Sequence, residues 1–178
     1  MANVLRTRIF GPLGMADSGF WTCQTGRLAT AYGPTPGGLV ARDSPAGTWS
    51  HPPAFGDGAA GLVSTADDLL AFARMLLGGG GPVLSGDAVR AMTSDQLTPA
   101  QKARGGLGPD FFKRQSWGFG QAVQDSGAYG WAGGLGTTWL VDPTCDLVVI
   151  VMSQRIFETP EAPRVHRDIQ SAAYASLT

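Results

Sequence analysis

Apolar residues recur at helical spacing in three parts of the chain. The first lies at residues 4–9 and stops at Gly11-Pro12, which predicts a short opening helix. The second runs over residues 69–77 after Thr65, whose hydroxyl can cap the first turn, and four glycines follow it. The third covers residues 163–177 and predicts an amphipathic helix that closes the chain.

Weaker patterns lie between these helices. A shorter helix is expected after Ser85, followed by a loop over residues 101–114. Residues 117–123 alternate loosely, while residues 136–141 and 146–152 are rich in β-branched side chains and flank a turn. The last two segments predict an antiparallel hairpin, against which the closing helix would pack.

Residues 12–61 show no sustained periodicity and contain many prolines and glycines. So long an irregular stretch indicates a lid or an excursion over a larger body. We therefore expect one α/β segment of the α+β kind, with an antiparallel sheet flanked by helices. Residues 1–61 would form a helix and a loop-rich lid, residues 62–115 a helical region, and residues 116–178 the sheet strands and closing helix.

Composition narrows the classes of partner. Thirteen basic and fourteen acidic residues give a net charge of -1, and no Lys/Arg run is present, which argues against nucleic acid. The longest apolar run, residues 147–152, is too short to span a membrane. Cys23 and Cys145 are far apart in the sequence, and we expect two buried free thiols rather than a disulfide framework.

Metal and nucleotide chemistry have little support in the sequence. His51 and His166 are the only histidines and neither lies in a motif, so no metal site is predicted. No glycine string precedes Lys-Ser or Lys-Thr, and no serine lies in Gly-x-Ser-x-Gly. We expect no cofactor.

Five phrases occur in an order that resembles the C-terminal half of the beta-lactamase-related serine hydrolases, which include class C beta-lactamases, DD-peptidases and family VIII esterases. They are residues 9–18 (IFGPLGMADS), 58–69 (GAAGLVSTADDL), 116–120 (SWGFG), 130–137 (GWAGGLGT) and 141–143 (VDP). The resemblance covers the chain from about Leu5 to its end. It implies a beta-lactamase/transpeptidase-like fold that is incomplete on its N-terminal side.

In that family a serine of a Ser-x-x-Lys motif attacks a carbonyl, and the lysine and a Tyr-x-Asn tyrosine move protons. This chain contains neither motif: Pro99 and Asp110 stand three positions before its only lysines, Lys102 and Lys113. The resemblance therefore implies that an N-terminal portion or a partner chain supplies the nucleophile and base. No catalytic residue of either kind is assigned here.

The third family motif is present as Trp131-Ala132-Gly133, where penicillin-binding relatives have Lys-Thr-Gly. The resemblance implies that Trp131 presents an apolar wall, that Gly133 lets substrate approach, and that the Gly134 amide donates to the developing oxyanion. Without the lysine cation, an ester or amide lacking the beta-lactam carboxylate is the expected substrate. The alternative is that Trp131 only packs against the sheet beneath the lid.

These observations lead to two hypotheses for the function, from different classes of protein. The first is the C-terminal part of a serine hydrolase that acts on small ester or amide substrates through an acyl-enzyme and is inactive alone. Its incomplete sheet would expose an edge and favour self-association. The second is a non-catalytic ligand-binding or regulatory module of the same fold. A self-contained enzyme that pairs another serine with His51 or His166 has no motif in its favour.

Overall fold

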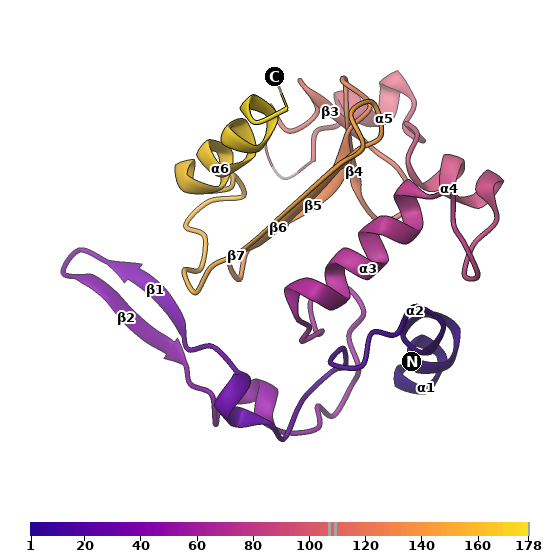
Figure 1. Ribbon diagram of the computed structural model, residues 1–178. Coiled ribbons are helices and arrows are strands. Elements are labelled where there is room, and N and C mark those ends of the chain that lie inside the picture. Colours follow the sequence, from indigo (N-terminus) through magenta and orange to yellow (C-terminus); the bar gives the residue numbers. More distant parts are fainter. Residues whose placement is uncertain (107, 109, 178) are drawn as a thin grey trace.

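The computed structural model describes residues 1–106, 108 and 110–177. Its main feature is an antiparallel sheet of five strands within these residues, ordered along the sheet as they are along the chain (Figure 1). The strands are β3 (Gln115–Trp117), β4 (Ala122–Gln124), β5 (Tyr129–Gly133), β6 (Thr137–Asp142) and β7 (Leu147–Met152). The hairpin predicted from residues 136–152 is therefore confirmed as β6 and β7, whose residues pair from Thr137↔Met152 to Asp142↔Leu147.

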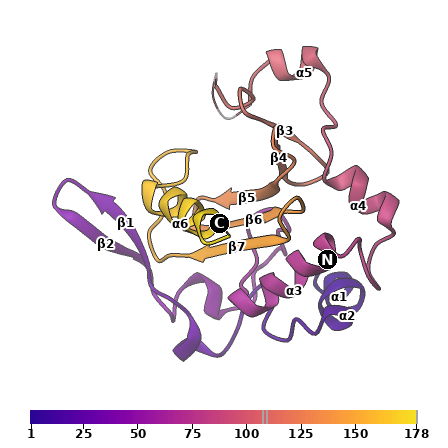
Figure 2. The same ribbon diagram turned by 45° about the horizontal axis from the view of Figure 1, so that its top comes forward.

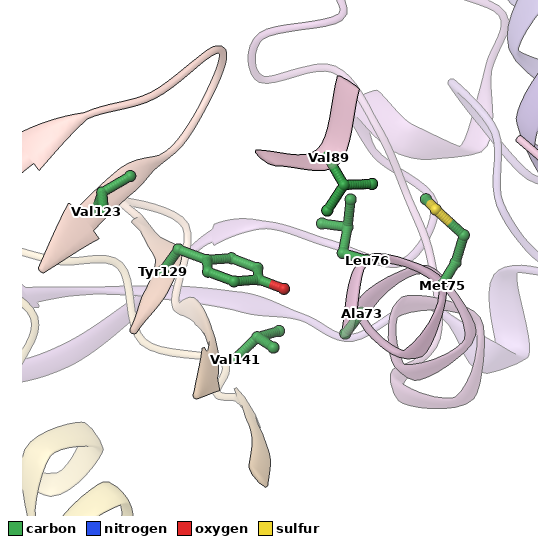
Figure 3. Close-up of a cluster of buried hydrophobic side chains, with 7 residues drawn as sticks. All are labelled: Ala73, Met75, Leu76, Val89, Val123, Tyr129 and Val141. Carbon is green, nitrogen blue, oxygen red and sulfur yellow. The ribbon is translucent and has the colours of Figure 1, made fainter. Parts of the chain in front are cut away.

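Two helices cover opposite faces of the sheet, α3 (Ala66–Leu77) and α6 (Arg164–Ala175), as Figures 1 and 2 show. Because side chains alternate along a strand, Tyr129 and its partner Val141 point to the face that α3 covers. They form a core with Ala73 and Leu76 of α3, and Figure 3 shows the Tyr129 ring reaching from the sheet toward that helix. The fold class and the positions of these two helices agree with the sequence prediction.

Local sequence signals set the ends of α3. The Thr65 side chain accepts a hydrogen bond from the Asp68 amide at 3.2 Å, as expected of an N-cap. At the other end the Gly78 amide donates to the Arg74 carbonyl, and the glycines follow. The shorter helix α4 (Gly86–Met92) begins in the same way, with Ser85 as its cap.

The opening helix runs further than the sequence predicted. It consists of α1 (Ala2–Leu5), a π-helical stretch (Arg6–Phe10) and α2 (Gly11–Leu13), and it ends at Gly14 with φ of +69°. Gly11-Pro12 does not end it, and Pro12 lies in the last turn, directly after the π-helical stretch.

The segment predicted as an irregular lid contains a hairpin. Strands β1 (Ala31–Thr35) and β2 (Gly38–Asp43) pair with each other and project away from the main sheet (Figure 1). Two short 3-10 turns, Thr25–Arg27 and Thr48–Ser50, flank the hairpin. Tyr32 attaches it to the chain beyond β7: its amide donates to the Gln154 carbonyl, and its carbonyl accepts from the Ile156 amide.

Other local predictions need correction. Residues 117–123 are not one strand but the ends of β3 and β4, joined by a turn in which the Gly118 amide donates to the Gln121 carbonyl. The predicted loop over residues 101–114 begins inside a helix, α5 (Pro99–Ala103). The prediction of two buried thiols was wrong, since Cys23 is exposed and Cys145 is half-buried. In the part of the chain that the structure describes, no helix is long and apolar enough to cross a membrane.

Candidate functional site

The predicted site segment lies on strand β5, at a place where the sheet is open. Strand β4 pairs with β5 only through Ala122↔Gly130 and Val123↔Tyr129. Beyond that point, within the described residues, Trp131 to Gly133 pair on one side only, with β6. An open strand edge leaves backbone donors and acceptors free to meet another segment or a ligand.

Trp131 belongs to an aromatic cluster. Its ring stands edge-on to Trp117 of β3, with ring centroids 4.8 Å apart, and it also faces Phe111 at 6.3 Å. Phe111 contacts Trp117 at 6.0 Å, so the three rings touch one another. Trp131 is half-buried, and these partners come from residues 111–117 rather than from the segment predicted as a lid. The cluster gives one end of the open edge an apolar wall.

The turn after β5 exposes the predicted oxyanion donor. Gly134 is exposed, and a side chain added to it would meet no atom within 4 Å. Among the described residues its N–H has no acceptor, while its carbonyl accepts from the Phe157 amide at 2.8 Å. A backbone amide without an acceptor is available to donate a hydrogen bond to a ligand, and the oxyanion role of Gly134 stays a prediction.

A serine and a lysine do lie close together near the aromatic cluster, but both are engaged. The Ser116 hydroxyl donates to Asp95, and Lys102 forms an ion pair with the same carboxylate. Hydrogen bonds from Lys102, Ser116 and the Leu97 amide lower the pKa of Asp95 to about 2. A carboxylate with so low a pKa is too weak a base to activate the serine as a nucleophile, so this cluster fastens the segment before α5 to β3.

The structure also brings together a histidine and a serine that the sequence did not connect. His166 of α6 is buried, and its Nε2 lies 3.3 Å from Ser153 Oγ, while Nδ1 lies 3.0 Å from Thr138 Oγ1. The Ser153 hydroxyl also has the Gly136 carbonyl as an acceptor, at 3.0 Å. This arrangement differs from a catalytic triad, in which histidine accepts the serine proton and a carboxylate orients the ring. His51 is exposed.

No sequence signal identifies the His166 contacts, because Thr138 and Ser153 lie 28 and 13 residues away. Among the described residues, no group of three His, Cys, Asp or Glu side chains is placed to hold a metal ion. The expectation of a site without metal or cofactor stays a prediction.

The sheet between α3 and α6, with the third motif on its half-open strand, defines a beta-lactamase/transpeptidase-type fold. Comparison with known families agrees: the chain belongs to the Beta-lactamase family, whose model matches residues 1–174.

Two proteins of similar sequence and one solved structure of similar fold accompany this family match. Protein Rv1367c of Mycobacterium tuberculosis is 34% identical over 171 residues, which cover 85% of this chain and 43% of that protein. Esterase EstB of Burkholderia gladioli is 27% identical over 194 residues, covering 92% of this chain and 46% of EstB. The structure of the LovD6 mutant of simvastatin synthase from Aspergillus terreus superposes with a TM-score of 0.78 at 24% identity, covering 99% of this chain and 51% of the other. The chain thus spans about half the length of each.

Proposed function

We propose that this chain is the C-terminal part of a serine hydrolase that cleaves ester or amide bonds through an acyl-enzyme. Its contribution is the substrate wall and one oxyanion donor, while the serine, lysine and tyrosine come from an N-terminal portion or a partner chain. The observation that carries the proposal is the open edge of β5, where the Trp131 wall and the unpaired Gly134 amide follow one another.

Each residue has a distinct role in this reaction. The incoming serine gives its proton to the lysine and tyrosine supplied with it and forms a bond to the carbonyl carbon, and the carbonyl oxygen takes the negative charge that the Gly134 amide stabilises. Collapse of this intermediate breaks the bond to the alcohol or amine, which leaves with that proton, and water then hydrolyses the acyl-enzyme to release the acid and restore the serine. Gly133 and Ala132 keep the strand edge free of bulky side chains, while Trp131 contacts the apolar part of the substrate.

Ester substrates are favoured over carboxylate-bearing beta-lactams. The motif position that holds lysine in penicillin-binding relatives holds Trp131 here, so no cation from this position can pair with a substrate carboxylate. The aromatic surroundings, Trp117 and Phe111, would also leave a carboxylate without a polar partner on that side. Esterase EstB, a sequence relative, is named for the same chemistry.

The test is turnover of a p-nitrophenyl short-chain ester and a chromogenic cephalosporin. The isolated chain is measured first, and then again with the polypeptide encoded immediately upstream. We expect no turnover by the chain alone and ester hydrolysis by the combination. Turnover by the isolated chain would overturn the claim that its nucleophile comes from elsewhere. Binding of ester analogues without turnover in either case would favour the ligand-binding module.

Two matched variants test the roles within the active combination. Gly134→Pro removes the amide hydrogen and should lower kcat on the order of 100-fold, whereas Gly134→Ala keeps the donor and should change kcat far less. Trp131→Ala should lower kcat/KM for the ester about 10-fold through lost apolar contact. Trp21→Ala is its control, because Trp21 is an exposed tryptophan outside the cluster.

A further inference from the structure

We propose that His166 is a positioning residue that acts through Ser153 to hold the β5–β6 turn, residues 133–137, which carries the Gly134 amide. The consequence for catalysis rests on the proposed function. The link between His166, Ser153 and the turn involves only residues of this chain, so it can be measured without turnover.

The His166 side chain extends from α6 to one end of the sheet. His166 projects from α6, is 1% exposed, and places Nδ1 3.0 Å from Thr138 Oγ1 near the start of β6. Its Nε2 lies 3.3 Å from the Oγ of Ser153, the residue that follows β7. Both contacts lie at the end of the β6–β7 pair where the β5–β6 turn begins, so the ring is a buried link between α6 and that end of the sheet.

We infer the tautomer of the ring from the hydrogens that its two hydroxyl partners can supply. The Ser153 hydroxyl has a single hydrogen, which it donates to the Gly136 carbonyl at 3.0 Å. Its oxygen can therefore only accept from His166, so Nε2 carries the ring hydrogen. Nδ1 must then accept the Thr138 hydroxyl hydrogen. The result is one directed chain of hydrogen bonds, from Thr138 through His166 and Ser153 to the Gly136 carbonyl.

Three backbone hydrogen bonds hold the same turn. The Ser153 amide also donates to the Gly136 carbonyl, at 2.8 Å, and the Gly136 amide donates to the Gly133 carbonyl at 3.0 Å. On the other side, the Phe157 amide donates to the Gly134 carbonyl, and the Phe157 ring stands edge-on to His166 with centroids 5.2 Å apart. Both residues that clamp the turn from the β7–α6 connection therefore touch His166.

This link favours the neutral ring. Burial lowers the pKa of His166 below its ordinary value, and its hydrogen-bond partners, Thr138 of β6 and Ser153 just after β7, are hydroxyls. Charged groups of the neighbouring segments already have partners: Arg155 pairs with Glu158, Arg164 pairs with Asp168, and Arg167 donates to the Ala162 carbonyl. At the far end of β6, Asp142 accepts a hydrogen bond from the Tyr174 hydroxyl. If Nδ1 were also protonated, it could no longer accept the Thr138 hydrogen, and Thr138 would have to accept from the ring instead. We infer that this change weakens the hydrogen bonds that hold the turn.

The decisive experiment is an NMR pH titration of the whole chain labelled at histidine and glycine. We expect His166 as the Nε2–H tautomer, titrating below the ordinary value for histidine, with the Gly134 and Gly136 amide signals moving at the same midpoint as His166. His51→Gln, at an exposed histidine, should leave that midpoint unchanged. Glycine signals that do not follow His166, or a ring protonated on Nδ1, would overturn the proposal.

A second measurement tests the consequence for catalysis in the combination of this chain with its upstream polypeptide. Ser153→Ala should lower kcat roughly 10-fold with KM changed less than about twofold, and Ser153→Thr, which keeps the hydroxyl, should restore most of it. Unchanged kcat in Ser153→Ala would contradict the positioning role. If the combination shows no turnover, the proposed function fails, while the NMR titration still decides the link between His166 and the turn.

Discussion

The Tyr174 hydroxyl donates a hydrogen bond of 2.7 Å to Asp142 Oδ2 and so joins the last turn of α6 to the end of β6. Asp142 is 5% exposed, and burial alone would raise its pKa. Hydrogen bonds from Thr144 and Tyr174 outweigh burial and lower the pKa of Asp142 below its ordinary value. An ionised carboxylate at the end of β6 therefore anchors the helix that carries His166.

Tyr174→Phe tests this anchor. The variant keeps the ring but removes the hydrogen bond to a buried charge, so the free energy of unfolding should fall by about 1–3 kcal/mol. Urea unfolding followed by tryptophan fluorescence gives the value. Tyr32→Phe is the control, because the described residues show no hydrogen bond from the Tyr32 hydroxyl. Equal losses in the two variants would show that the anchor contributes nothing specific.

Asp95 should make the chain sensitive to acid. Its pKa is lowered to about 2 in the folded chain, against about 3.9 for an unfolded aspartate. A carboxyl with a depressed folded pKa stabilises the fold above its unfolded pKa, and this contribution is lost as pH falls from about 4 toward 2. Thermal unfolding between pH 6 and 2 should therefore show a decline that Asp95→Asn reduces.

The control for Asp95 is Asp87→Asn. Asp87 forms an ion pair with Arg90, but both side chains are largely exposed, and such pairs contribute little. Its acid profile should match that of the unchanged chain. If Asp95→Asn also keeps the full decline, the Asp95 cluster does not set the acid response.

Gly136 should tolerate no side chain. Its φ is +108°, and an added Cβ would lie 2.5 Å from the Ser153 carbonyl oxygen. Strain and overlap together predict that Gly136→Ala lowers the free energy of unfolding by about 2–4 kcal/mol. Gly134→Ala, two residues away and facing open space, should cost less than about 1 kcal/mol. Similar costs measured by urea unfolding would contradict this account of the turn.

The elements that the sequence predicted best are those that local rules determine. The Thr65 cap and the apolar face of residues 69–77 define α3, and β-branched residues around the 142–144 turn define the β6–β7 hairpin. Helix α5 carried a readable signal that sequence reasoning missed, because Thr98 and Gln101 form a capping box.

Other features depend on contacts that no local pattern encodes. The β1–β2 hairpin has Pro34 in one strand and is held by cross-strand pairing and by Tyr32, so no amphipathic period marks it. The Trp131 wall was predicted from family resemblance alone, and its partners Phe111 and Trp117 only emerge from the fold. The His166 link joins three separate elements and could be found only in three dimensions.

Strand β7 is the last strand of the sheet within the described residues, and its sequence, LVVIVM, is entirely apolar. Unpaired backbone N–H and C=O groups along an apolar edge strand can form hydrogen bonds with a strand of another chain. We therefore expect the isolated chain to self-associate, with an apparent mass in sedimentation that about doubles as concentration rises. Met152→Lys places a charge at an exposed position of this edge and should keep the chain monomeric.

Val165→Lys separates an edge effect from a general gain in solubility. Val165 is an exposed apolar residue of α6, so the variant adds the same charge away from β7. It should associate like the unchanged chain. Suppression by both variants would mean that net charge rather than strand pairing governs association, and a strict monomer at every concentration would contradict the exposed-edge prediction. If the upstream polypeptide also abolishes self-association, it competes for β7, as expected if it completes the sheet.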